Sequence, residues 1–186
     1  MRKSKKIISL SACAAVLAAC ATTASSQMKP FGDEDSIRYA DKLWATLSDA
    51  RLVGPNTILA KPYQGQHPHG AVLDNMESEV TVDGHTGAVI VKKNYGGEGV
   101  SIDGVANNPE RYLMSVTVMY KREAGYDPAN QNWFWAKYTP DGGLAKNPKG
   151  MALAGRVAKG MPKGCIACHG VAPGDDYVYS HDRYAP

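Results

Sequence analysis

The sequence Cys165-Ile166-Ala167-Cys168-His169, close to the end of the 186-residue chain, constrains the protein more than any other feature. Two cysteines two residues apart, followed directly by a histidine, form the pattern by which a chain attaches haem c. The thiols of Cys165 and Cys168 add to the vinyl groups of the haem, and His169 binds the iron as the proximal ligand. The sequence therefore predicts an iron-containing haem c that is covalently attached to the chain.

Other uses of a cysteine pair fit this sequence less well. A redox-active C-x-x-C pair precedes a long helix in a βαβ unit, and too few residues follow Cys168 to complete one. A structural zinc site needs a fourth ligand and usually a second cysteine pair. Small electron-carrier cytochromes have a methionine ligand far downstream of the haem motif, whereas no methionine follows His169. We therefore expect a haem protein of another type.

The first nineteen residues have the composition of an export signal. Residues 2–6 contain four basic side chains, and residues 7–16 form an apolar run too short to span a bilayer. The sequence Leu17-Ala18-Ala19-Cys20 then resembles a lipoprotein cleavage box, which predicts a lipid on Cys20. Cleavage near Ala24, which would remove Cys20, is the alternative.

These observations predict three segments: an export signal (1–19), a flexible tether (20–32) and a haem domain (33–186). The expected location is the periplasmic side of a bacterial membrane, held by a lipid anchor, or otherwise the soluble periplasm. Removing the signal takes away four of the 21 basic residues and none of the 18 acidic ones. The mature chain is then nearly neutral, and its charge gives no reason to expect nucleic-acid binding.

Hydrophobic periodicity predicts helices near both ends of the domain. Apolar residues at helical spacing indicate an amphipathic helix over residues 36–50, with Asp33 or Asp35 as its N-cap. A second helix is expected over residues 151–159, ahead of the haem motif.

The middle of the chain is instead typical of β-structure. Residues 88–91, 115–120 and 133–138 are rich in β-branched and aromatic side chains, and a turn at 125–128 separates the last two runs. The predicted fold class is α+β: a mainly antiparallel sheet with helices at both ends and haem c near the C-terminus. Three such runs argue against the four-helix bundle of the c′ cytochromes.

The iron face opposite His169 has several candidate ligands. Methionines on strands more often fill the core, and loop histidines more often lie at the surface, so we expect an open distal site for a small molecule. The candidates are His67, His69, His85, His181, Met76, Met114, Met119, Met151 and Met161.

The order of these motifs resembles the cytochrome P-460 family. It runs from His69-Gly70 through residues 88–95, 116–121 and 132–138 to the haem motif at 164–170. The resemblance implies a mainly antiparallel β-fold, a homodimer, and an oxidoreductase acting on hydroxylamine or nitric oxide that passes electrons to a periplasmic acceptor. Relatives named cytochromes c′-β bind nitric oxide instead, and a simple electron carrier is a third alternative.

The resemblance also assigns roles to two strand residues. In cytochrome P-460 a lysine is joined covalently to a haem carbon, and Lys92 matches it. Alternation along a strand puts Lys92 and Lys93 on opposite faces, so only one of them can face the haem. Where the hydroxylamine oxidisers have a glutamate as the base, Thr117 matches; it could donate a hydrogen bond to a bound ligand but could not act as that base.

Two further groups of residues are relevant to the distal site. Three carboxylates could replace the missing base only if a loop folds over the haem: Glu98, Asp103 and Glu123. Four aromatic residues are expected to fill the core, with one beside the haem edge and Phe134 as a candidate to crowd the distal site: Trp133, Phe134, Trp135 and Tyr138.

Overall fold

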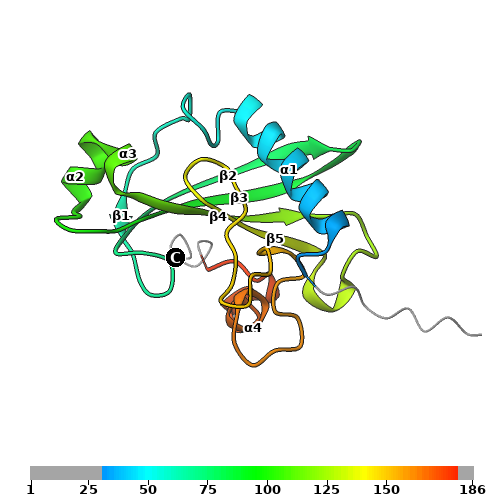
Figure 1. The fold of residues 1–186 in the computed structure, drawn as a ribbon. Helices are drawn as coiled ribbons and strands as arrows, with labels where there is room; N and C mark the ends of the chain where they lie inside the picture. Colours follow the sequence, from blue (N-terminus) through cyan, green and yellow to red (C-terminus); the bar gives the residue numbers. More distant parts are fainter. Residues whose placement is uncertain (1–30, 180–186) are drawn as a thin grey trace, which may run out of the picture.

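The computed structural model describes residues 31–179, so the predicted export signal, Cys20 and His181 lie outside the described residues. Six antiparallel strands form one sheet in sequential order, β1-β2-β3-β4-β5-β6 (Figure 1). The strands are β1 (Tyr63–Gln64), β2 (Val72–Val82), β3 (His85–Tyr95), β4 (Leu113–Lys121), β5 (Trp133–Tyr138) and β6 (Ala154–Gly155). The helices are α1 (Glu34–Asp49), α2 (Ile102–Asn107), α3 (Pro109–Tyr112) and α4 (Cys165–His169), with short 3-10 turns at Pro128–Asn130 and Pro173–Asp175.

Helix α1 covers one face of the sheet, as Figure 1 shows. It begins after Asp33, whose carboxylate accepts a hydrogen bond from the Ser36 amide at 2.8 Å, the usual geometry of an N-cap. Leu43 and Leu47 are fully buried against the sheet. The helix expected over 36–50 is therefore present, displaced by one or two residues at each end.

The two faces of the sheet build two separate apolar clusters. Val89, Val91 and Val118 pack under α1, whereas Ile90 and Met119 belong to a second cluster that includes Ile166 of α4. Consecutive strand residues point to opposite faces, so this division follows from the alternation of side chains along β3 and β4. Figure 1 shows α1 and α4 on opposite sides of the sheet. The haem motif therefore lies on the face that α1 leaves uncovered.

The α+β fold is confirmed, with three strands, β1, β2 and β6, that the sequence pattern did not indicate. The three predicted runs lie in β3, β4 and β5, and β5 has the predicted bounds. β2 was missed because its centre is polar, with Glu77, Ser78 and Glu79 exposed. It pairs with β3 over eleven residues across a turn in which Asp83 and Gly84 both have positive φ, 50° and 80°. An Asp-Gly pair in this conformation is typical of a two-residue hairpin.

The helix expected over residues 151–159 is wrong. Gly150, Gly155 and Gly160 have φ of 79°, 99° and 72°, which a right-handed helix does not accommodate. Gly155 instead pairs with Trp135 in the sheet, and a Cβ there would meet the Ser36 hydroxyl at 2.5 Å. This segment is the edge strand β6 with turns around it, so its apolar residues line the sheet rather than one side of a helix.

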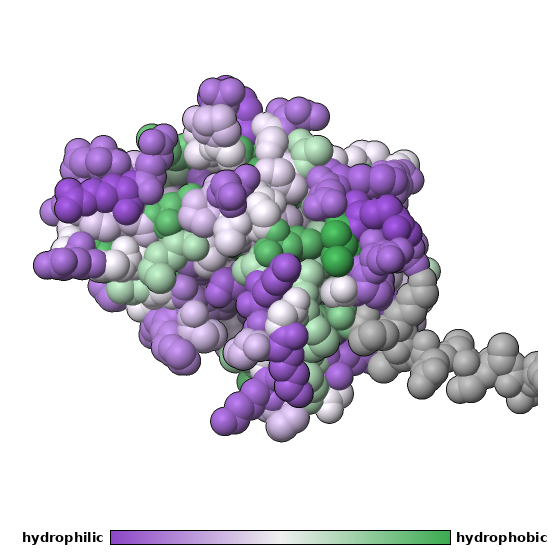
Figure 2. All heavy atoms as spheres, viewed as in Figure 1, coloured by the Kyte–Doolittle hydropathy of each residue, from purple (hydrophilic) through white to green (hydrophobic). Residues whose placement is uncertain are grey.

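The surface is mostly hydrophilic on the face drawn in Figure 2, with small separate apolar patches. Within residues 31–179, no helix is both long enough and apolar enough to cross a membrane.

A buried ion pair stabilises the junction of β2 and β3. Lys93 and Asp74 are each 3 % exposed, and the Lys93 Nζ lies 3.9 Å from the Asp74 carboxylate. Asp74 also accepts a hydrogen bond from the Tyr95 hydroxyl at 2.6 Å, and Lys93 donates one to Thr57 at 2.8 Å. Burial raises the pKa of Asp74 and lowers that of Lys93, and each charge opposes the shift of the other.

Replacing Lys93→Met should lower the free energy of unfolding at pH 7 by about 3–5 kcal/mol, because Asp74 then lacks its counter-charge. The pKa of Asp74 should rise further above its unfolded value, so the folded state takes up a proton and the deficit shrinks as the pH falls toward 3.8. The double variant Lys93→Met/Asp74→Asn should recover most of the loss. Urea unfolding at pH 7 and pH 5 measures both effects, and a deficit that does not change with pH would contradict this account.

Candidate functional site

A cavity of about 530 Å³ lies between the uncovered face of the sheet and the haem motif. Its volume is within the range of about 300–1,000 Å³ that is common for small-molecule and cofactor sites. Most of its wall is apolar, and the sheet contributes Ile90, Thr117, Met119 and Trp135. The lining includes Cys165, Cys168 and His169 together with Phe31, His67, His69, Lys92, Lys137, Leu153, Val157, Met161 and Lys163.

A second hollow of about 710 Å³ adjoins the first. The two share His67, His69, Lys92, Cys168 and His169 among their lining residues. The motif histidine therefore faces open space on more than one side, as a ligand to a flat prosthetic group would require.

The imidazole of His169 is held in a single orientation. Its Nδ1 lies 2.7 Å from the carbonyl oxygen of Tyr177, and because a carbonyl can only accept, Nδ1 carries the hydrogen. The lone pair is then on Nε2, which is the arrangement that second-shell hydrogen bonds impose on metal-binding histidines. Burial lowers the pKa of His169, so the ring is neutral and able to bind a metal at neutral pH.

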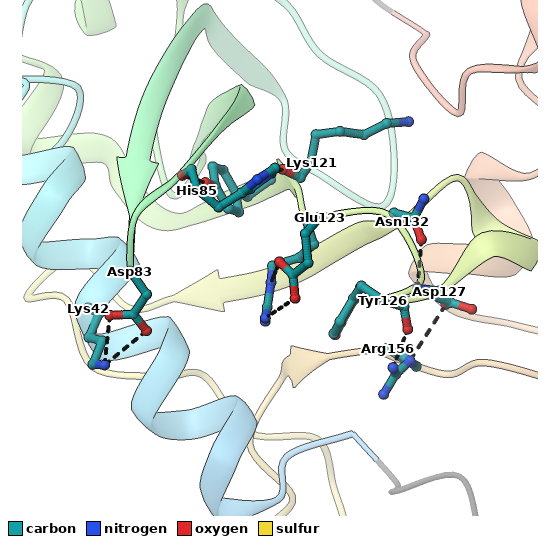
Figure 3. A network of polar contacts seen from close by, with 11 residues as sticks. Lys42, Asp83, His85, Lys121, Glu123, Tyr126, Asp127, Asn132 and Arg156 are labelled. Atoms are coloured by element: carbon teal, nitrogen blue, oxygen red, sulfur yellow. Dashed lines mark hydrogen bonds and ion pairs between the residues drawn. The ribbon is translucent and has the colours of Figure 1, made fainter.

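A chain of hydrogen bonds supports the segment that accepts from His169. The Tyr177 hydroxyl donates to Asn130 at 3.2 Å, and the Asn130 amide donates to Asp127 at 2.9 Å. Asp127 is fully buried and forms ion pairs with Lys159 and Arg156, the latter shown in Figure 3. The turn after β4 is thereby joined both to the residues before the haem motif and to those after it.

Three strands contribute one transverse row of polar side chains to the cavity. Thr117 of β4 is the register partner of both Lys92 of β3 and Lys137 of β5. Directly opposite residues of antiparallel strands share a face, so all three side chains project toward the haem motif. Lys93 lies on the other face in the buried pair with Asp74. Lys137 was missed, although alternation along β5 places it on the same face as Trp133 and Trp135.

The hydroxyl of Thr117 is oriented by its neighbours. It accepts a hydrogen bond from the Asn94 amide at 3.3 Å and donates a weak one to the Lys92 carbonyl at 3.4 Å. The side chain is only partly buried and lines the cavity, so the hydroxyl can donate to a bound ligand in place of the carbonyl.

Among the described candidate histidines, His69 has a ring contact with His169. The ring centroids are 6.0 Å apart and the ring planes are at 88°. Burial and the nearby charge of Lys92 lower the pKa of His69 to about 4, so this ring is also neutral at neutral pH. His67 lines the same cavity, whereas His85 is hydrogen-bonded to the Lys121 carbonyl at 3.1 Å and is not part of the lining (Figure 3).

The candidate methionines also divide into those that line the cavity and those that do not. Met119 and Met161 line the cavity, Met76 packs against the cluster under α1, and Met114 is 60 % exposed; Met151 is not part of the lining.

One expectation about the distal wall is wrong, and the condition for a substitute base is not met among the described residues. Phe134 does not crowd this cavity, because it faces α1 and packs on Tyr39 with ring centroids 5.0 Å apart. Phe31 and Trp135 supply the aromatic surface instead. Glu98, Asp103 and Glu123 lie outside both hollows, and among the described residues no carboxylate lines either one. Within residues 31–179, these three carboxylates therefore do not reach the site.

The residues present fit a haem group. The wall offers a broad apolar surface, two thiols next to a correctly oriented imidazole, and lysines for the anionic propionates. The Trp135 Nε1 is buried and has no hydrogen-bond partner among the described residues. An unpaired buried donor in the wall of a cavity is the kind of group that a bound polar substituent satisfies.

Comparison with known proteins gives one match. A family model described as Cytochrome P460 matches residues 71–180, which is more than half of the chain. The matched part contains β2 to β6 and α4, and so includes most of the wall of the first cavity but not Phe31, His67 or His69. No curated protein and no solved structure matches the chain.

Replacing Asp127→Ala should lower the free energy of unfolding by about 3 kcal/mol, because Lys159 and Arg156 then lose their buried counter-charge. Trypsin should also cleave the folded protein faster at these two residues. The control is Lys42→Ala, which removes an exposed ion pair with Asp83 (Figure 3) and should cost less than about 1 kcal/mol. Equal losses in the two variants, or unchanged cleavage in Asp127→Ala, would contradict a role for Asp127 in holding this segment.

Proposed function

The chain belongs to the cytochrome P460 family and is a haem protein, and from this premise we propose that it attaches haem c through Cys165 and Cys168 and binds nitric oxide at an iron held by His169. The observation that carries the proposal is the convergence of the two thiols and the oriented imidazole on one largely apolar cavity. The haem, when bound, supplies an iron site for a diatomic ligand and for electron exchange.

The two cysteines differ in their surroundings. Each thiol adds across one vinyl group: a carbon–sulfur bond forms, the S–H hydrogen passes to the other vinyl carbon, and no oxidant is consumed. Burial raises the pKa of the Cys165 thiol, and the charge of Lys137 acts in the opposite direction. Cys168 is exposed and directly precedes His169.

On the distal side, the wall supports ligand binding better than hydroxylamine oxidation. Oxidation of hydroxylamine releases protons and needs a nearby acceptor. The described lining offers no carboxylate, and Thr117 is a donor that suits a bound nitrogen oxide. Only the family supports turnover as a hydroxylamine or nitric oxide oxidoreductase that passes electrons to a periplasmic acceptor.

The surroundings of the domain form part of the same proposal. The composition of residues 1–19 supports export, and Cys20 supports a lipid anchor on the periplasmic side of a membrane. A homodimer is proposed from the family resemblance.

Intact mass of the purified protein tests the attachment. We expect the mass of the chain plus one haem, retained after denaturation, and loss of that haem in the Cys165→Ser/Cys168→Ser variant. We also propose that Lys92 is cross-linked to the haem. Forming the N–C bond would remove one hydrogen from the lysine amine and one from the haem carbon, and a two-electron oxidant such as a peroxide would be reduced in the same step. The wild-type mass would then be lower by two hydrogens than that of Lys92→Met after correction for the substitution.

Equal corrected masses would remove Lys92 from the covalent site and leave the thioether attachment standing. Haem that dissociates from the denatured wild-type protein would overturn c-type attachment itself.

The placement of His69 favours a second candidate function, that of an electron carrier. Two imidazoles bound to one metal on opposite sides have ring centroids roughly 6 Å apart, since each metal–nitrogen bond is about 2 Å. His69 and His169 are 6.0 Å apart in this structure. If both bind the iron, no position is left for nitric oxide unless His69 is displaced.

The ferric spectrum distinguishes the two functions. An open site predicts a five-coordinate, high-spin spectrum that His69→Ala leaves in the same class, together with tight nitric oxide binding. An electron carrier predicts a six-coordinate, low-spin spectrum that becomes high-spin in His69→Ala. His85→Gln is the control, since His85 lies outside the cavity lining. A low-spin wild-type protein that does not bind nitric oxide would overturn the proposed function.

A further inference from the structure

We infer that Lys137, together with the Thr117 hydroxyl, lets this cavity bind a small anion, specifically an anionic nitrogen oxide such as nitrite, in addition to neutral nitric oxide. The inference rests on the haem site of the proposed function, because it adds a second class of ligand at that site. It is carried by the composition of the wall: three lysines and, among the described residues, no carboxylate.

The register of the strands sets the arrangement of these charges. Lys92 and Lys137 occupy strands on either side of Thr117, in one row across the sheet. Neighbouring strands are about 4.8 Å apart, so the two lysines start about 10 Å from each other. The Thr117 hydroxyl is a neutral donor between them, so an oxyanion entering the cavity meets a hydrogen-bond donor beside the charge of Lys137, and beside that of Lys92 as well where the cross-link to haem has not formed.

The apolar wall makes these charges effective. Ile90, Met119 and Trp135 form the next row of the same sheet face, and all three are buried. A charge beside such a surface is screened less than one in open water. Lys137 is itself half-buried, whereas Lys163 is exposed at the rim. An anion inside the cavity is therefore stabilised mainly by the strand lysines.

The test is a spectrophotometric titration of the ferric holoprotein with sodium nitrite, and separately with nitric oxide as the neutral probe. In Lys137→Gln we expect the Kd for nitrite to rise about tenfold, the effect of one unit charge about 10 Å away at an effective dielectric constant near 20. The Kd for nitric oxide should stay within about twofold, because a neutral ligand interacts little with that charge. Lys137→Arg should keep nitrite binding, and Lys149→Gln, an exposed lysine outside the lining, is the matched control.

The outcomes separate the inference from the proposed function. If the substitution weakens nitrite and nitric oxide equally, or neither of them, the role of Lys137 in anion binding is overturned while nitric oxide binding stands. If the wild-type protein binds nitrite with the expected dependence on Lys137 but does not bind nitric oxide, the proposed function fails and the inference stands. If neither probe changes the spectrum, both are overturned.

Discussion

Consecutive residues of β3, β4 and β5 face opposite sides of one antiparallel sheet, and both the core and the cavity depend on this alternation. One set of side chains, represented by Val91 and Val118, packs under α1. The other set, represented by Lys92 and Thr117, faces the haem motif. A shift of one residue in the register of β3 would exchange Lys92 with a valine and place Lys93 in the cavity. The same pairings that bury the core therefore determine which functional groups face the haem.

The opposite wall of the cavity is built from irregular chain and needs different support. Residues 152–169 contain only the two-residue strand β6 and the single turn of α4. Their position depends on backbone pairing with β5, on the buried carboxylate of Asp127, and on packing of Ile166 and Val157 against Trp135. The wall formed by the sheet thus carries Lys92 and Lys137. The irregular wall, which is held in part by ion pairs, carries the thiols of Cys165 and Cys168. The proximal histidine is further fixed by Tyr177, which follows it in the chain.

Sequence patterns predicted the elements whose signals are local. β5 was predicted with its bounds because its aromatic run is continuous, and α1 because its apolar spacing and Asp33 cap lie together. β2 was missed because its centre, Glu77, Ser78 and Glu79, is polar and exposed, which interrupts the apolar pattern of a strand. The segment around Gly155 was assigned to a helix because the spacing of its apolar residues fits both a helix and a strand. Only tertiary pairing with Trp135 decides between them.

For the site, the motif predicted its own three residues, and alternation together with the family resemblance predicted Lys92, but contacts between distant segments could not be predicted. His69 and His169 are a hundred residues apart in the chain, and no periodicity relates them. The exclusion of Phe134 and of the three carboxylates also depends on how the layers stack.

The sequential order of the strands has a consequence for how the protein matures. Each strand pairs with its neighbour in the chain, so the sheet closes only short loops as it folds. The lysine-bearing wall can therefore form before α4 packs against it, which would leave Cys165 and Cys168 accessible for the proposed attachment of haem.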